Sequence, residues 1–66
     1  MSVVKVIELI AEGKSIEAAV ESALTEATKT VRNIKSIYVE DIQAIIDNSK
    51  ISTYRVNVKV SFVVDN

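Results

Sequence analysis

Tyr54–Val64, YRVNVKVSFVV, is the stretch that decides the fold. Every second residue in it is aromatic or aliphatic, and these residues are Tyr54, Val56, Val58, Val60, Phe62 and Val64. Strict alternation with polar residues is typical of a β-strand with one buried face and one face in water. At about 3.3 Å per residue the strand is roughly 35 Å long. A globular chain of this length has a radius of gyration of only about 11 Å, so we expect the strand to extend beyond its own subunit's core.

Two further segments, Val3–Ala11 and Ile37–Ile46, are predicted to be strands. Neither face of Val3–Ala11 is wholly polar, which predicts apolar cover on both sides for part of its length. A single helix covers one side, so we expect the second cover to come from a neighbouring subunit. In Ile37–Ile46 the alternation slips at Glu40 and Asp41. This slip indicates either a β-bulge or a strand whose two halves bury opposite faces.

A helix is predicted between the first two strands, because the apolar residues there recur at helical spacing. They are Ile16, Ala19, Val20, Ala23, Leu24, Ala27 and Val31. The stripe predicts an amphipathic helix of about sixteen residues. Ser15 is the expected N-cap and Asn33 the helix-ending residue. Gly13 lies in the preceding turn, Glu12–Lys14, where we expect it to adopt a positive φ.

The remaining turn, Asp47–Lys50, is predicted from its composition and joins the last two strands as an antiparallel hairpin. The element order is therefore β-α-β-β in a single domain spanning residues 1–66. We predict the α+β class, with a three-stranded antiparallel sheet packed on one helix.

Self-association is expected from the size of the chain. A domain of 66 residues buries only about 60% of the surface of its unfolded chain. The sequence has no Cys and no His, which excludes disulfides and the common zinc sites. Unpaired sheet edges also favour pairing with other copies. We therefore expect a closed homo-oligomer.

Charge and composition argue against several functions. The net charge is −1, with both signs interspersed, so no basic face favours nucleic acid. No apolar run approaches the roughly 20 residues that a bilayer requires, and no signal peptide is evident. We expect a cytoplasmic protein without nucleic-acid or membrane partners. The absence of His, Cys and a Gly-rich phosphate loop predicts that it is not an enzyme.

The element order and three motifs resemble the dodecin family over nearly the whole chain. The motifs are VxKVIEL at residues 3–9, SIEAAVESALTEATKTVRNI at 15–34 and TYRVNVKVSF at 53–62. The most specific parts are ATKTVRNI at 27–34 and YxVxxKVxF at 54–62. The resemblance implies a hollow homododecamer that binds a flavin (FMN, FAD or riboflavin) at subunit interfaces and stores or shields it without catalysis.

The candidate ligand site carries departures from the family. Flavin-binding dodecins place a Trp after the helix, and its ring stacks on the isoalloxazine; Ser36 stands there, and the chain has no Trp. A family Gln that bonds the polar edge of the flavin is replaced by Arg55, which only donates hydrogen bonds. Tyr38 shares the strand face of Ser36 and can replace part of the stacking surface. The alternatives are a solvated or intersubunit salt-bridge residue for Arg55, a small polar residue without a ligand role for Ser36, and an interface or packing residue for Tyr38.

Glu40 and Asp41 form the candidate metal site, because carboxylate oxygens suit calcium or magnesium. Adjacent strand residues point to opposite faces, so both can serve one site only if the bulge exists. The resemblance adds that some relatives lacking the Trp are thought to bind cations. The alternative functions are therefore a flavin-free variant that binds divalent cations and a purely structural cage.

Overall fold

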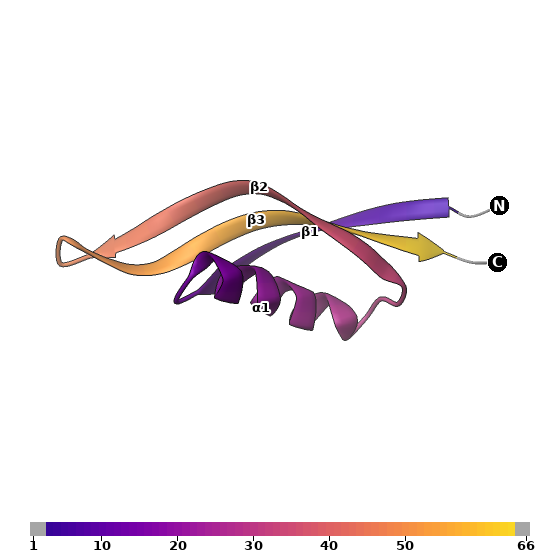
Figure 1. Cartoon of the computed structure of the whole chain (residues 1–66), viewed down its shortest axis with the longest axis horizontal. Coiled ribbons are helices and arrows are strands. Elements are labelled where there is room, and N and C mark those ends of the chain that lie inside the picture. The colour runs from indigo at the N-terminus through magenta and orange to yellow at the C-terminus, as the bar shows by residue number, and fades with distance from the viewer. Residues whose placement is uncertain (1–2, 65–66) are drawn as a thin grey trace.

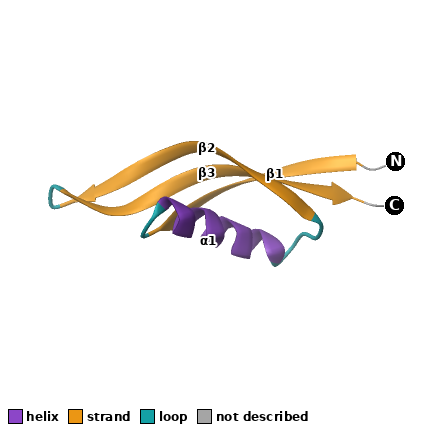
Figure 2. Cartoon of the chain, in the orientation of Figure 1, coloured by secondary structure: helices purple, strands orange, loops and turns teal. Residues whose placement is uncertain are grey.

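The fold is a three-stranded antiparallel sheet with a helix across one face (Figure 1). The computed structural model describes residues 3–64. In chain order the elements are β1 (Val3–Gly13), α1 (Ile16–Thr28), β2 (Ile34–Asp47) and β3 (Lys50–Val64). The sheet order is β1-β3-β2, and both pairs are antiparallel (Figure 2). The predicted α+β class and β-α-β-β order are confirmed, and every strand is longer than the sequence pattern predicts.

The central strand β3 gives the molecule its elongated shape. It runs for 15 residues, and the chain measures 51 × 19 × 13 Å with a radius of gyration of 13.7 Å. A compact chain of this length has a radius of gyration of about 11 Å. The β2–β3 hairpin projects past one end of α1, and the outer ends of β1 and β3 project past the other (Figure 1). The expectation that the strand outruns the core is confirmed.

The core is a narrow contact between α1 and β3. The buried residues are Ala19, Ala23 and Ala27 of α1 and Val56, Val58 and Val60 of β3. Because alanine side chains end at Cβ, the helix lies close against the valine row. Each fully buried valine contributes roughly 1.5 kcal/mol or more. Ile16 and Leu24 belong to the predicted apolar stripe but remain 41% and 38% exposed, so the helix covers little more than the middle of the sheet.

Gly13 is required for close packing, and the expectation of a positive φ is wrong. Among the described residues no glycine has a positive φ. Instead β1 continues through Gly13, which pairs with Tyr54 of β3. A Cβ at this position would lie 2.5 Å from the backbone nitrogen of Ala19 and 2.7 Å from the carbonyl carbon of Ala18. The absence of a side chain lets the start of α1 cross directly over β1.

The helix starts where predicted and ends earlier. The Ser15 hydroxyl accepts a hydrogen bond from the Ala18 N–H at 3.1 Å, which confirms it as the N-cap. The helix is 13 residues long and ends at Thr28, so the longer prediction is wrong. Val31 fits the helical spacing of apolar residues although it lies beyond the helix, because its side chain still packs on the core. Its N–H donates a hydrogen bond to the Ala27 carbonyl at 3.0 Å. Asn33, expected to end the helix, instead lies just before β2 with φ 60°, and its carbonyl accepts a hydrogen bond from the Val63 N–H at 3.1 Å.

A β-bulge in β2 confirms the first interpretation of the slip at Glu40 and Asp41. Val39 pairs with Val58 while Asp41 pairs with Asn57, so Glu40 is the extra residue. Ile42 consequently returns to the same side of the sheet as Val39. The two halves of β2 therefore present their apolar residues to one face rather than to opposite faces.

The hairpin turn is tighter than predicted. Asn48 and Ser49 alone form it, with φ 53° and 62°. Two consecutive left-handed residues are the geometry of a type I′ turn, which matches the twist of antiparallel strands. Asp47 and Lys50, expected in the turn, instead pair with each other across the strands.

Candidate functional site

The candidate site lies on the face of the sheet turned away from α1, which we call the open face. Strand alternation, register and the bulge place the following residues there: Val4, Val6, Glu8, Ile10 and Glu12 of β1; Thr53, Arg55, Asn57, Lys59, Ser61 and Val63 of β3; and Ser36, Tyr38, Glu40, Asp41, Gln43 and Ile45 of β2. Val4, Val6 and Ile10 are 60%, 55% and 66% exposed. The face therefore mixes uncovered aliphatic side chains with a polar centre.

The register orders the open face in cross-strand rows. Each row takes one residue from β1, one from β3 and one from β2, in that order. The four rows are Val6 with Ser61 and Ser36; Glu8 with Lys59 and Tyr38; Ile10 with Asn57 and Asp41; and Glu12 with Arg55 and Gln43. Consecutive rows are about 6.6 Å apart, because residues two apart on a strand share a face. All three expected ligand contacts and Asp41 thus fall on one face, in four successive rows.

Ser36 and Tyr38 occupy the first two of these rows. The Ser36 hydroxyl lies 2.6 Å from the Ser61 hydroxyl and forms a hydrogen bond with it. Tyr38 is 66% exposed. Tyr54 and Phe62 alternate with the open-face residues of β3 and so face the helix side. Among the described residues, Tyr38 supplies the aromatic surface of the open face.

Two of the three cations of β3, Arg55 and Lys59, form ion pairs that direct their side chains toward opposite edges of the sheet. Arg55 donates from Nε and Nη2 to Oε2 of Glu12 at 2.8 and 2.6 Å, toward β1. The Lys59 ammonium lies 3.3 Å from Oε2 of Glu40, toward β2. These side chains are between about a third and a half exposed, so each pair contributes at most about 1 kcal/mol. The ion pairs affect the site through geometry, because they hold the Arg55 and Lys59 side chains away from the centre of β3.

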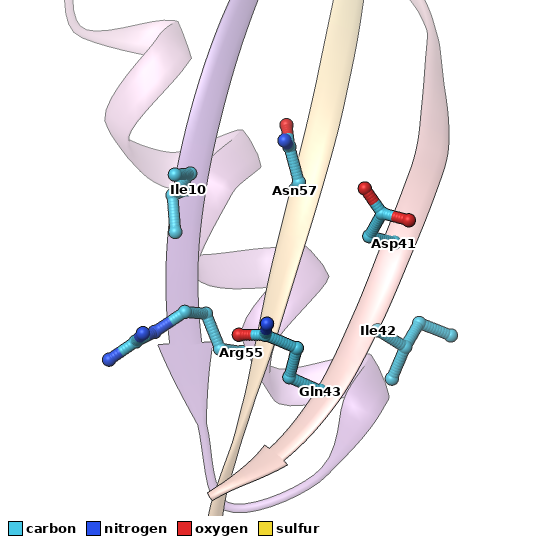
Figure 3. Close-up of a pocket in the computed structure, with 6 residues that line it drawn as sticks. All are labelled: Ile10, Asp41, Ile42, Gln43, Arg55 and Asn57. Atoms are coloured by element: carbon cyan, nitrogen blue, oxygen red, sulfur yellow. The ribbon is translucent and has the colours of Figure 1, made fainter.

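A pocket of about 380 Å³ occupies the last two rows (Figure 3). Its lining residues are Ile10, Asp41, Ile42, Gln43, Arg55 and Asn57. Arg55 and Asp41, both proposed from the sequence, therefore meet in one pocket. Ser36, Tyr38 and Glu40 do not line it, although Tyr38 lies one row away. Figure 3 shows the Arg55 side chain extending across β1, away from the Gln43 amide.

Asn57 and Gln43 were missed as candidates by the sequence reasoning. The Asn57 Oδ1 atom is buried and has no hydrogen-bond partner within residues 3–64. The alternation of Arg55, Asn57 and Lys59 was enough to place Asn57 on the polar face. The pairing of Gln43 with Arg55 could not be read from the sequence, because the bulge sets that register.

The two carboxylates of the candidate metal site, Glu40 and Asp41, both lie on the open face. The bulge turns Glu40 to the face on which Asp41 lies, and Glu40 is bound by Lys59. No group of three or more His, Cys, Asp or Glu side chains within residues 3–64 is arranged to hold a metal ion. In the same part of the chain, no helix has the length and hydrophobicity that a membrane crossing requires.

Comparison with known proteins gives a consistent result. The family model described as Dodecin matches residues 3–65. The tt0972 protein of Thermus thermophilus is 30% identical, with a TM-score of 0.93 over 100% of this chain and 98% of that one. A tryptophan-to-phenylalanine variant of T. thermophilus dodecin is also 30% identical, with a TM-score of 0.92 and 100% of both chains covered. Dodecin from Streptomyces davaonensis, 18% identical, shares the fold, with a TM-score of 0.91 over 98% and 97% of the two chains. No curated protein matches the chain.

Proposed function

The chain belongs to the dodecin family, and we propose that it binds and stores a flavin-type ligand without catalysis. The ligand lies on the open face, between copies of the chain assembled as a hollow homododecamer. The observation that carries this proposal is the open face itself. Its aliphatic side chains and its single exposed aromatic ring have no cover within the described chain.

The exposed area supports burial between copies. The chain exposes 4925 Å², whereas a compact monomer of 7.2 kDa exposes about 4100 Å². The excess, roughly 800 Å², equals one partner's share of a standard protein interface. The dodecin resemblance implies a hollow multimer, and the proposal extends that assembly to the present chain.

Tyr38 is the residue that we assign to the ligand's ring. A planar heterocycle on the open face needs an aromatic surface to stack on, and Tyr38 is the one that the described face provides. An aromatic pair contributes roughly 0.5 to 1.5 kcal/mol beyond its buried area. Ser36 and Ser61 form the floor beside this ring, and Arg55 lies toward the far end of the site.

The proposal is tested by titrating riboflavin into the purified protein and following its fluorescence, with light scattering to give the mass of the assembly. We expect a mass near twelve subunits and saturable quenching. Tyr38→Leu should weaken riboflavin binding roughly 3- to 10-fold, because it removes the stacked ring. Tyr54→Phe, on the helix side, serves as the control and should bind normally. Absence of binding by the wild-type protein would refute the flavin assignment.

A second prediction concerns the missing tryptophan. Ser36→Trp should raise riboflavin affinity at least about tenfold, because an indole ring adds an aromatic surface beside Tyr38. Ser36 is exposed, and within the described residues its hydroxyl bonds the Ser61 hydroxyl alone, so the sheet tolerates the change. Ser36→Ala is the control that removes the hydroxyl pair without adding a ring. Equal affinity of the Trp and Ala variants would place the ligand elsewhere.

Divalent cation binding is the second candidate, favoured by the bulge that puts Glu40 and Asp41 on one face. Symmetry-related copies would have to supply further oxygen ligands, since calcium takes six to eight. Calcium should then raise the melting temperature of the wild-type protein and leave that of Asp41→Ala unchanged. If calcium has this effect and riboflavin fluorescence does not change on titration, cation binding replaces flavin storage as the proposed function.

A further inference from the structure

The tip of the β2–β3 hairpin places an asparagine and a small residue together in water. Asn48 and Ser49 are both exposed, and they alone form the turn, with φ 53° and 62°. The hairpin projects past the end of α1 (Figure 1). Ile46 and Ile51, the paired apolar residues nearest the tip, are 59% and 57% exposed. Within residues 3–64, therefore, the turn is held only by the two strands that it joins.

The backbone N–H of Ser49 lies outside the hydrogen-bonded ladder. Asp47 and Lys50 pair directly across the strands, and the hydrogen bond that closes such a turn runs from the N–H of its fourth residue to the carbonyl of its first. The N–H of the second turn residue is thus left to water. The side chain of Ser49 is also small, so it leaves space around its own backbone nitrogen. Asn48 therefore has an accessible nucleophile next to its side-chain amide.

We propose that Asn48 is a site of spontaneous deamidation, with water as the second reactant. The Ser49 nitrogen gives up its proton and bonds to Asn48 Cγ, the bond from Cγ to Nδ2 breaks, and ammonia leaves. The product is a five-membered cyclic imide. Water then opens the ring at one of its two carbonyls, which gives either aspartate or isoaspartate. The net change is the replacement of the amide nitrogen by a carboxylate oxygen.

The other asparagines within residues 3–64 lack this combination of features. Asn33 also has a positive φ, of 60°, but the β-branched residue Ile34 follows it and packs against the core. Asn57 lies in the central strand and is followed by the fully buried Val58. Reaction at either site requires part of the core to open first, which costs free energy. Reaction at Asn48 requires only movement of the turn.

Either product changes the tip of the hairpin. Aspartate at position 48 adds a negative charge next to Asp47. Isoaspartate routes the backbone through the former side chain and so adds one carbon to a turn of two residues. Because the turn type fixes the register of a hairpin, this extra carbon should disturb the pairing of Asp47 with Lys50. The hairpin of an aged molecule thus differs from that of a newly made one.

The test uses the purified protein, incubated in mildly alkaline buffer and sampled over time. Trypsin cleaves after Lys and Arg, so the three asparagines fall in separate peptides, residues 33–35, 36–50 and 56–59. By mass spectrometry, the deamidated form of peptide 36–50 should accumulate at least about ten times faster than those of the other two, which corresponds to a barrier difference of about 1.4 kcal/mol. An isoaspartate-specific carboxyl methyltransferase should label the same peptide.

Two variants that keep the turn separate the chemistry from the fold, because glycine adopts a positive φ without strain. Ser49→Gly further uncovers the nucleophilic nitrogen and should react faster than the wild type. Asn48→Gly removes the amide and should leave peptide 36–50 unmodified over the same period. The proposal is overturned if peptide 36–50 of the wild type stays unmodified or reacts no faster than the other two peptides. A Ser49→Gly protein that reacts no faster than the wild type overturns it as well.

Discussion

Gly13→Ala should destabilise the protein by about 3 kcal/mol, the upper end of the range for overpacked sites. The added Cβ would meet three backbone atoms of α1 at 2.5, 2.7 and 2.9 Å. Backbone atoms at the start of a helix cannot rotate away as a flexible side chain can, so α1 must lift from the sheet. The buried row Ala19, Ala23 and Ala27 would then lose its contact with β3.

Chemical unfolding at a fixed subunit concentration measures the effect, because assembly makes apparent stability depend on concentration. Lys14→Ala is the matched control: the residue is exposed and adjacent, and its change should alter stability by less than about 0.5 kcal/mol. A Gly13→Ala variant as stable as this control would show that the crossing of α1 over β1 is looser than described.

The two interpretations of Gly13 show how far a sequence alone can reach. A single glycine between a strand and a helix normally signals a turn with positive φ. Here it signals a close approach, which depends on where Ala18 and Ala19 lie after folding. Val31 likewise led to a helix prediction that was too long, because it packs on the core at helical spacing although the helix ends at Thr28. Local patterns predict which residues are buried better than they predict the backbone that buries them.

The bulge in β2 was predictable because it changes the phase of the apolar alternation in the sequence. The slip at Glu40 and Asp41 has no explanation in a regular strand with one buried face, since the period of a strand is two. The site beyond the bulge was only partly predictable. The alternation fixes Arg55 and Asn57 on one face, but the neighbour of each across the sheet depends on the number of residues that the bulge inserts. Gln43 could therefore be recognised as part of the site only from the register.

Val6→Glu should abolish assembly, and this result distinguishes an interface from a solvated surface. Val6 is 55% exposed in the single chain. If the open face remained in water, a glutamate there would change stability by no more than about 0.5 kcal/mol. If copies bury this face, the change places an unpaired charge in an apolar contact, which costs several kcal/mol per ion. A closed assembly repeats that cost in every subunit, so the variant should appear as small, poorly folded species in light scattering and circular dichroism.

Val6→Thr separates the effect of charge from that of shape, since threonine and valine are close in size. It should assemble, with a modest loss of stability. The row of Val6 also contains Ser61 and Ser36, so an interface at Val6 extends to the ligand floor, and loss of assembly should remove riboflavin binding as well. A Val6→Glu protein that keeps the full mass of the wild type would show that the open face is not the contact between copies. The ligand site would then have to be completed by this chain alone, and a half-exposed face of three strands does not enclose a flavin.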